Sequence, residues 1–404
     1  MKKSKRKIII LVGDGMGDYP IAELDNRTPL EAAYTPAMDY ISSHGVLGKL
    51  QTVPQGFPPG SDVANLSLLG YRPEDIYTGR SPLEAASLGV DLQEGEIAFR
   101  CNLVTLEGEA LSLKMVDYSG GHVSTDEARE LIAALASRLN DDSLKLYPGI
   151  SYRHLLVYSK DVAGLITAPP HDYTGKDVSA FWNGYNHVPD LMAFMEKSRE
   201  ILKDHPVNKR RLEAGKLAAN GTWLWGEGKA PDMMTLQERY GLTGSLISAV
   251  DLLKGIGAYA GMEIVDVPGA TGYLDTNYQG KVDAALHAIN SKDVVLVHVE
   301  APDETGHQGD LKNKIRAIEE FDQKIVQPIL DGMPEDKDFR VVVCMDHFTP
   351  LSLRTHTTDA VPVAVYDSRD GEKNSGLAYN EKNGAAAKLE FKNGEEFFQY
   401  VIGE

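Results

Sequence analysis

The chain has 404 residues, with 41 lysines and arginines against 59 aspartates and glutamates, so its formal net charge is −18. Hydrophobic residues make up 42% and charged residues 25%, which is typical of a globular protein and excludes a disordered, collagen-like or coiled-coil chain. The acidic balance argues against nucleic acid or an anionic membrane as the main partner. The length favours one large domain with a second domain inserted into it, or two domains.

The two cysteines, Cys101 and Cys344, are far apart and form no CxxC motif. We therefore expect neither a disulfide framework nor a thiolate zinc site, and a reducing compartment is favoured. A basic run that contains Lys2, Lys3 and Lys5 is followed by only a short apolar run at 8–12, too short for the apolar part of a signal peptide. No apolar run has the length of a transmembrane helix. These features predict a cytoplasmic protein.

Three short apolar runs each lead into acidic or histidine side chains. Residues 8–12 lead into Asp14, residues 294–299 into Asp303, and residues 341–345 into Asp346 and His347. Continuous runs rich in valine and isoleucine are typical of parallel strands that helices cover on both faces. Because such sheets bind ligands at the carboxyl ends of their strands, we expect these side chains to meet at one sheet edge.

The segments between these runs predict helices and an inserted domain. Capping boxes with proline at the first helical position occur at 28–31 and 81–84 and predict helix starts. Amphipathic helices are predicted near 125–139, 189–219, 246–260, 281–290 and 312–330. The stretch 96–170 differs, with apparent strands at 97–100, 110–113, 152–158 and 164–168 around one helix. We interpret it as a small α+β insert at 96–176 in an α/β core formed by 1–95 and 177–404.

The polar residues after the apolar runs suggest metal ligands. Asp303 and His307 lie four residues apart, on one face if helical, and can then share an ion, although such pairs are common on exposed helices. Asp346 and His347 are better candidates, because adjacent polar side chains at the end of a strand contribute little to packing. Asp14 and His356 extend the set, with a turn residue and an ordinary loop histidine as the alternatives. Mixed carboxylates and imidazoles suit two divalent ions such as Mn²⁺ or Zn²⁺ better than Mg²⁺.

Ser61 is a candidate nucleophile. It follows the rigid turn Pro58-Pro59-Gly60 and precedes an apparently helical run at 63–69. A helix N-terminus favours an anion, and a bound cation lowers the pKa of a serine hydroxyl. The alternative is a plain N-cap serine. No GxSxG, HExxH or GxxxxGK[ST] motif is present, and a relaxed dinucleotide fingerprint at 255–260 follows a helix-like stretch instead of a strand.

Several segments together resemble the cofactor-independent (2,3-bisphosphoglycerate-independent) phosphoglycerate mutases of the archaeal type, in the alkaline phosphatase superfamily. They are GDGMGD, TPLEAA, PPGSDVANLSLLGY, YTGRSPLEA, VHVEAPDETGH, MDHFTP and RTHTTDAVPV, and they extend from the first strand to about residue 365. The resemblance implies an alkaline-phosphatase-like three-layer core, two metals and a transiently phosphorylated serine. It assigns one metal to Asp14, Ser61, Asp346 and His347, and the other to Asp303, His307 and His356.

The implied activity is the glycolytic interconversion of 3- and 2-phosphoglycerate, with a small phosphorylated metabolite as partner; a homo-oligomer is compatible with it. Candidate substrate contacts, each with an exposed surface residue as the alternative, are Arg80, Arg153, His154, His122, Asn208, Arg211 and Lys281. The insert departs from the family, because residues 115–122 replace an expected arginine-rich stretch and residues 169–172 an expected Asp-Pro-His. A homoserine-kinase-like phosphotransferase and a metal-dependent phosphomonoesterase are therefore alternatives on the same core. The intact ligand set argues against a binding protein without chemistry.

Overall fold

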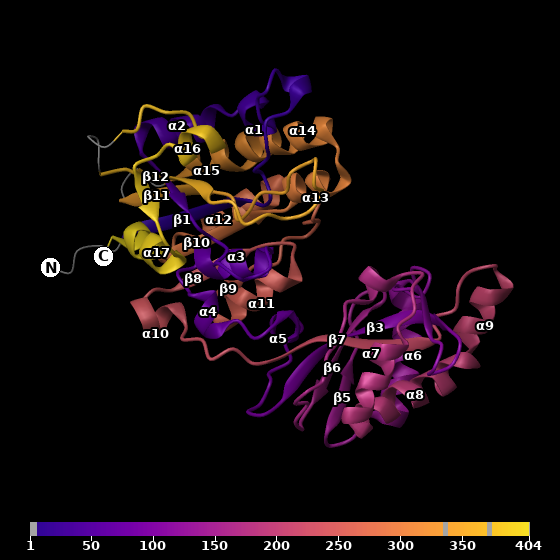
Figure 1. Cartoon of the computed structure of the whole chain (residues 1–404). Helices are drawn as coiled ribbons and strands as arrows, with labels where there is room; N and C mark the ends of the chain where they lie inside the picture. Colours follow the sequence, from indigo (N-terminus) through magenta and orange to yellow (C-terminus); the bar gives the residue numbers. More distant parts are fainter. Residues whose placement is uncertain (1–5, 334–337, 370–373, 404) are drawn as a thin grey trace. The chain divides into compact units, whose positions relative to one another are not determined.

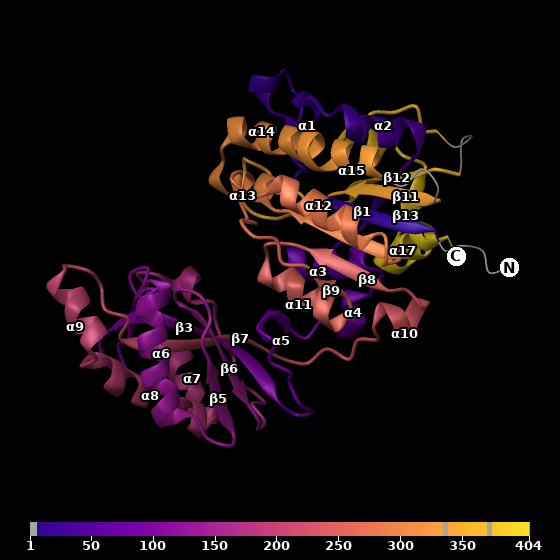
Figure 2. The same cartoon turned by 180° about the vertical axis from the view of Figure 1, so that it is seen from behind.

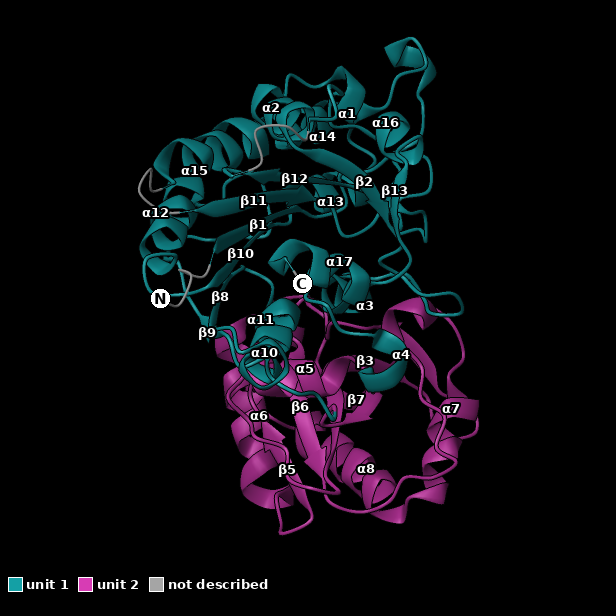
Figure 3. Ribbon diagram, turned by 90° about the vertical axis from the view of Figure 1, so that its left-hand side faces the viewer, with its two compact units in different colours: residues 1–77, 232–404 teal, residues 78–231 magenta. Residues whose placement is uncertain are grey.

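The computed structural model describes residues 6–333, 338–369 and 374–403, so Lys2, Lys3 and Lys5 lie outside the described residues. The chain forms two compact units (Figure 3). Unit 1 consists of residues 1–77 and 232–404, and unit 2 of residues 78–231. None of the helices in the described ranges is both long enough and apolar enough to cross a membrane.

Unit 2 is wider than the insert expected at 96–176. Its last strand, β7 (Gly221–Lys229), pairs antiparallel with its first, β3 (Ile97–Glu107). Helix α5 (Arg80–Ser87) joins the same unit, because the Ser81 hydroxyl donates to the Gly226 carbonyl of β7 and accepts from the Arg100 amide of β3. The boundaries therefore move to 78 and 231, and residues 78–95 and 177–231 do not belong to the core.

The sheet of unit 1 has the strand order β13-β2-β12-β11-β1-β10-β8-β9. The strands are β1 (Lys7–Gly13), β2 (Val46–Leu50), β8 (Gly244–Ile247), β9 (Glu263–Ile264), β10 (Val294–Val299), β11 (Phe339–Cys344), β12 (Val361–Asp367) and β13 (Leu389–Phe391). Within the described sheet, β12 is the strand whose two pairings are antiparallel, and the remaining pairings are parallel. This confirms the predicted mostly parallel sheet.

Helices cover both faces of this sheet (Figures 1 and 2), with α2, α12 and α15 on one side and α3, α11 and α17 on the other. The helices of unit 1 are η1 (Ala22–Leu24), α1 (Pro29–Ala32), α2 (Pro36–His44), α3 (Ser61–Leu68), α4 (Pro73–Ile76), α10 (Leu236–Tyr240), α11 (Asp251–Tyr259), α12 (Tyr278–Ala288), α13 (Ala301–Gln308), α14 (Leu311–Phe321), the π-helix η4 (Asp322–Val326), α15 (Gln327–Gly332), α16 (Glu381–Ala385) and α17 (Gly394–Ile402). The predicted three-layer α/β core is thus confirmed.

The three predicted strands lie side by side and end together. In the register of the sheet, Gly13 of β1 faces Val299 of β10, and Val12 faces Cys344 of β11. Nearly every residue of these strands is buried, as expected for strands covered on both faces. Their carboxyl ends therefore form one edge, where the polar residues that follow them meet.

Unit 2 is an α+β domain around an antiparallel sheet of order β4-β3-β6-β5, with β7 also paired to β3. Its remaining elements are β4 (Lys114–Asp117), α6 (Thr125–Leu139), β5 (Leu144–Tyr147), β6 (Arg153–Tyr158), η2 (Pro170–Tyr173), α7 (Ser179–Gly184), η3 (Tyr185–His187), α8 (Pro189–Lys203) and α9 (Pro206–Glu213). The strands expected at 110–113 and 164–168 do not form. The capping box expected at Ser81 is also absent, because α5 begins one residue earlier and Ser81 bonds β7 instead.

Candidate metal centre

Polar side chains gather at the carboxyl ends of β1, β10 and β11. Asp14 directly follows β1, and its amide donates to the Val299 carbonyl at the end of β10. Asp346 and His347 follow β11, and the Asp346 carboxylate accepts hydrogen bonds from the amides of Gly15 and His347. His347 Nε2 lies 3.4 Å from Asp14 Oδ1 and 3.5 Å from Asp346 Oδ2. These three buried side chains form one group with the geometry of metal ligands.

A second group forms around Asp303 on α13. Because α13 is helical over 301–308, Asp303 and His307 share one face, and His307 Nε2 lies 3.2 Å from Asp303 Oδ2. His356 Nε2 lies 3.5 Å from Asp303 Oδ1 and 2.9 Å from His307 Nε2. Asp303, His347 and His356 also have ligand atoms within 4.8 Å of one another. His347 therefore belongs to both groups and joins them.

Ser61 is the first residue of α3 and points at the cluster. Gly60 caps the helix in an extended conformation, and Ser61 Oγ lies 3.1 Å from His347 Nε2. Asn65, one turn along α3, donates to the Ser61 carbonyl and to Asp346 Oδ2. The predicted nucleophile thus lies at a helix N-terminus beside the ligand groups, as the sequence predicted, and Asn65 links it to Asp346.

The electrostatics of the cluster reflect its buried carboxylates. Burial and the neighbouring Asp346 and Asp303 raise the pKa of Asp14 well above its ordinary value. Burial also tends to raise the pKa of Asp303, but its hydrogen bonds to His307 and His356 outweigh this and hold the pKa well below its usual range. The same bond to Asp303 raises the pKa of His307 to about 9. A cation placed among these carboxylates would relieve the repulsion that Asp14 experiences.

The donor set fits divalent metal ions. Asp14 Oδ1 is buried and has no hydrogen-bond partner among the described residues, so it is available as a ligand. The Nε2 atoms of His307 and His356 face each other at 2.9 Å, where at most one proton can lie between them. Carboxylate oxygens mixed with imidazole nitrogens are ligands of such ions. The residues present therefore fit the metals that the sequence predicted.

Lys281, predicted to reach a phosphate, lies in unit 1 on α12. It is 1% exposed, and its Nζ donates to the carbonyl of His298 on β10. Burial lowers its pKa to about 8. The lysine bonds the backbone of the sheet and does not reach solvent, so the structure gives it a supporting role in place of the predicted substrate contact.

Three of the predicted substrate contacts are instead structural residues of unit 2. The Asn208 amide donates to the carbonyls of Leu202 and Ala219 and accepts from the Ala219 amide. Arg211, 2% exposed, pairs with Glu127 at 2.7 Å and donates to three backbone carbonyls. His154 is buried, accepts from the Gly149 amide, and has a pKa that burial lowers to about 3. The polar groups of Asn208 and Arg211 thus bond the interior of unit 2, and His154 does so through Nδ1, while its buried Nε2 has no hydrogen-bond partner among the described residues.

The other three predicted contacts, Arg80, Arg153 and His122, are exposed or half-buried in unit 2. Sequence reasoning missed two neighbours, Arg100 and His171. Burial is the main cause that lowers the pKa of Arg100; Glu84 opposes it, and Arg80 and Arg153 add to it. Burial likewise lowers the pKa of His171, opposed by Asp172 and reinforced by Arg100 and Arg80. These arginines therefore lie close enough to influence one another, and Arg100 is paired with Glu84 at 3.0 Å. The sequence signal for Arg100 was a charged residue within a buried strand.

Aromatic rings pack against several of these residues. The Arg100 guanidinium lies 4.3 Å from the centroid of the Trp225 ring, and His171 packs edge-on against Trp225 at 5.5 Å. Tyr118 contacts both His122 and His171 through ring edges. An arginine that stacks on an aromatic ring keeps its planar set of donors for a carboxylate or phosphate.

Sequence reasoning also missed polar residues around the metal ligands in unit 1. His298 is a histidine inside a buried strand, and its Nε2 lies 3.0 Å from Asp14 Oδ2. Thr349 donates to Asp303. In the sequence, His298 could have been noticed as a polar residue in an otherwise apolar run. No sequence pattern marked Thr349.

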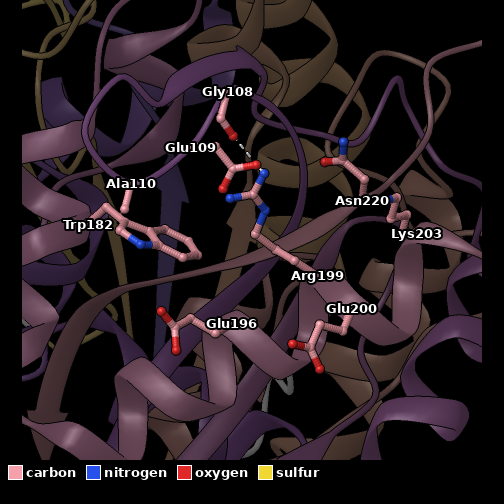
Figure 4. Close-up of a pocket in the computed structure, with 9 residues that line it drawn as sticks. All are labelled: Gly108, Glu109, Ala110, Trp182, Glu196, Arg199, Glu200, Lys203 and Asn220. Carbon is pink, nitrogen blue, oxygen red and sulfur yellow. Dashed lines mark hydrogen bonds between the residues drawn. The ribbon is translucent and has the colours of Figure 1, made fainter.

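Unit 2 also contains a cavity of about 610 Å³ between the segment after β3, α7 and α8 (Figure 4). Its walls carry Glu109, Glu196 and Glu200 beside Arg199. Arg199 donates to the Gly108 carbonyl and lies 5.6 Å from the Trp182 ring centroid. The cavity lacks the convergent metal ligands and nucleophile found in unit 1, so it is not the candidate site.

Comparison with known proteins gives a consistent result. A family model described as 2,3-bisphosphoglycerate-independent phosphoglycerate mutase matches residues 42–208. The chain is 50% identical over 386 residues to the 2,3-bisphosphoglycerate-independent phosphoglycerate mutase of Methanosarcina barkeri, covering 95% of this chain and 96% of that protein. It resembles the structure of a Pyrococcus horikoshii protein (TM-score 0.82, 28% identity, 99% and 98% covered). It also resembles the cofactor-independent phosphoglycerate mutase of Thermoplasma acidophilum (TM-score 0.66, 28% identity, 98% and 99% covered).

Proposed function

The chain belongs to the family of 2,3-bisphosphoglycerate-independent phosphoglycerate mutases, and we propose that it interconverts 3-phosphoglycerate and 2-phosphoglycerate through a phosphorylated Ser61. The observation that carries this proposal is the place of Ser61 at the N-terminus of α3, 3.1 Å from His347 Nε2 in the ligand cluster. The reaction is a step of glycolysis, and we expect it to run in the cytoplasm on a small phosphorylated metabolite.

Two divalent ions, with Mn²⁺ favoured over Zn²⁺ and Mg²⁺, would neutralise the phosphoryl oxygens and lower the pKa of the serine hydroxyl. Asp14, Ser61, Asp346 and His347 would hold one ion. Asp303, His307 and His356 would hold the other. The close approach of His347 to the second group supports a pair of neighbouring sites.

Phosphoryl transfer then takes place in two steps at Ser61. The Ser61 hydroxyl loses its proton, and its oxygen forms a bond to the phosphorus of the monoester while the bond from phosphorus to the glycerate oxygen breaks. That leaving oxygen takes up a proton and becomes a hydroxyl of glycerate. The other hydroxyl of the same glycerate then accepts the phosphoryl group and restores the serine. The N-terminus of α3 favours the negative charge that this exchange brings to Ser61.

Retaining glycerate between the two transfers requires contacts to its carboxylate. We assign this role to polar residues of unit 2, namely the arginines Arg80, Arg153 and Arg100 and the imidazoles of His122 and His171. Support comes from the ring of Trp225, which packs against both Arg100 and His171. A phosphomonoesterase would need no such retention, and a homoserine-kinase-like enzyme would need a nucleotide donor.

Phosphorus NMR distinguishes these functions. Mn²⁺-loaded protein is incubated with 3-phosphoglycerate and, separately, with ATP and homoserine. We expect 2-phosphoglycerate in the first tube and no new phosphoester in the second. Phosphohomoserine without 2-phosphoglycerate would overturn the proposal in favour of the kinase, and free phosphate alone would favour the phosphomonoesterase.

The phosphoserine is tested with Ser61→Ala. We expect this variant to lose turnover and still bind two metal ions, because the carboxylate and histidine ligands stay in place. Ser137→Ala, at an exposed serine on α6, serves as the matched control and keeps full activity. Turnover by Ser61→Ala would contradict the phosphoserine mechanism.

A further inference from the structure

Thr349 occupies the point where the three strand-end segments meet. It lies two residues after His347 and is fully buried. Its amide donates to the Gly17 carbonyl after β1, and its carbonyl accepts from the buried Lys314 of α14 at 2.7 Å. Its hydroxyl donates to Asp303 Oδ1 and lies 3.3 Å from His347 Nδ1. Its amide and its hydroxyl are thus tied to segments that carry metal ligands, and its carbonyl is tied to α14.

The direction of these hydrogen bonds sets the tautomer of His347. A hydroxyl has one proton, and the Asp303 carboxylate can only accept, so the Thr349 proton points to Asp303. The hydroxyl oxygen then accepts from His347, which places the imidazole proton on Nδ1. Nε2 then carries the lone pair, and it faces Ser61 Oγ at 3.1 Å and the carboxylates of Asp14 and Asp346 within 3.5 Å.

Two glycines show that Thr349 has no room to shift. Gly15 has φ +59°, and a Cβ there would lie 2.5 Å from Thr349 Oγ1. A Cβ at Gly306 of α13 would lie 2.6 Å from the Thr349 carbonyl oxygen. The loop after β1 and helix α13 therefore both pack directly on Thr349, and its hydroxyl is fixed against Asp303 and His347.

We propose that Thr349 is a positioning residue of the metal centre, which orients Asp303 and holds His347 in the tautomer that presents Nε2 to the ion. It thereby couples the two ligand groups through one hydroxyl. This inference rests on the metal centre of the proposed function and goes beyond it, because it concerns a residue that is not itself a ligand. Outer partners of metal ligands typically change metal affinity 10- to 100-fold.

Two substitutions separate the hydroxyl from the shape of the side chain. Thr349→Val keeps the shape and removes the hydroxyl, and Thr349→Ser keeps the hydroxyl and removes the methyl group. Mn²⁺ affinity is measured without substrate, by calorimetry and by electron paramagnetic resonance of free Mn²⁺. We expect the valine variant to lose about 10- to 100-fold in affinity and the serine variant to stay near the parent. Equal affinities for parent and valine, or equal losses in both variants, would overturn the proposal.

A second measurement uses the unsubstituted protein and does not depend on how the variants fold. Long-range ¹H–¹⁵N correlation spectra of histidine-labelled, metal-free protein report which ring nitrogen carries the proton, with His347→Gln to assign the signal. We expect a protonated Nδ1 and a bare Nε2, and the opposite tautomer would refute the proposal. Neither measurement involves phosphoglycerate, so a failure of the mutase assay leaves these results interpretable.

Discussion

A single methyl group at Gly15 should disrupt the metal centre. Gly15 has φ +59°, and a Cβ built there would lie 2.5 Å from Asp303 Oδ1 and 2.5 Å from Thr349 Oγ1. Gly15→Ala therefore inserts a methyl group between a metal ligand and the residue that orients it. The matched control is Gly376→Ala, because Gly376 has φ +64° and a Cβ there would meet nothing within 4 Å.

The expected magnitude follows from these distances. Both alanines carry a left-handed backbone strain of about 1–2 kcal/mol, so both variants should lose a similar few degrees in Tm from strain alone. At Gly15, ordinary contact at 3.4 Å further requires the Asp303 oxygen to move by about 0.9 Å. Metal–ligand distances tolerate only about 0.2 Å, so this movement removes Asp303 from its ligand position.

Mn²⁺ titration calorimetry and thermal unfolding of both variants test this reasoning. We expect Gly15→Ala to lose at least about 10-fold in affinity for one ion, while Gly376→Ala binds as the parent does. Unchanged binding by a folded Gly15→Ala protein would refute the reasoning. So would an equal loss of affinity in both variants, because backbone strain would then be the whole effect.

Two further predictions concern unit 2. Burial lowers the pKa of His154 to about 3, so the unfolded chain binds the extra proton between about pH 6.5 and 3 and stability falls as the pH drops below 6.5. Between pH 7 and 5 the free energy of unfolding should fall by up to about 2 kcal/mol for this reason. His154→Asn keeps an acceptor for the Gly149 amide and should reduce that fall, as measured by denaturant unfolding at both pH values. An unchanged pH dependence in this variant would contradict the prediction. Arg211→Met should lower stability by about 3 kcal/mol, because the carbonyls of Leu217, Gly120 and Gly121 lose their donor. The KM for 3-phosphoglycerate should stay unchanged, and the exposed Arg210→Met serves as control. A raised KM with an unchanged Tm would instead support a substrate contact by Arg211.

The convergence of the candidate metal ligands was predictable from the sequence because their positions follow from the pattern of the strands. Buried parallel strands are continuous apolar runs, so the polar residues that end them stand out, as Asp14 and Asp346 do. Their convergence follows from the parallel register of β1, β10 and β11. Ser61 was marked by the rigid turn before it.

The remaining errors arise where a role depends on contacts distant in sequence. No local pattern shows that β7 returns more than 100 residues later to pair with β3, and that pairing sets the boundary of unit 2. Asn208 and Arg211 lie in a strongly basic segment that is typical of an exposed surface, yet both are buried. Their hydrogen bonds to backbone carbonyls exist only once α9 packs against the rest of unit 2.

The order of strands in the sheet also has a consequence for how the protein is made. β1 lies between β10 and β11, so the ribosome adds about 280 residues before the first neighbour of β1 exists. At about 5–20 residues per second, that wait is roughly 14–56 s, during which the very apolar β1 is unpaired. Unit 2 is continuous in sequence and is complete before β10 is synthesised. We therefore expect the nascent chain to hold a folded unit 2 beside an exposed β1, which makes β1 a natural target for chaperones.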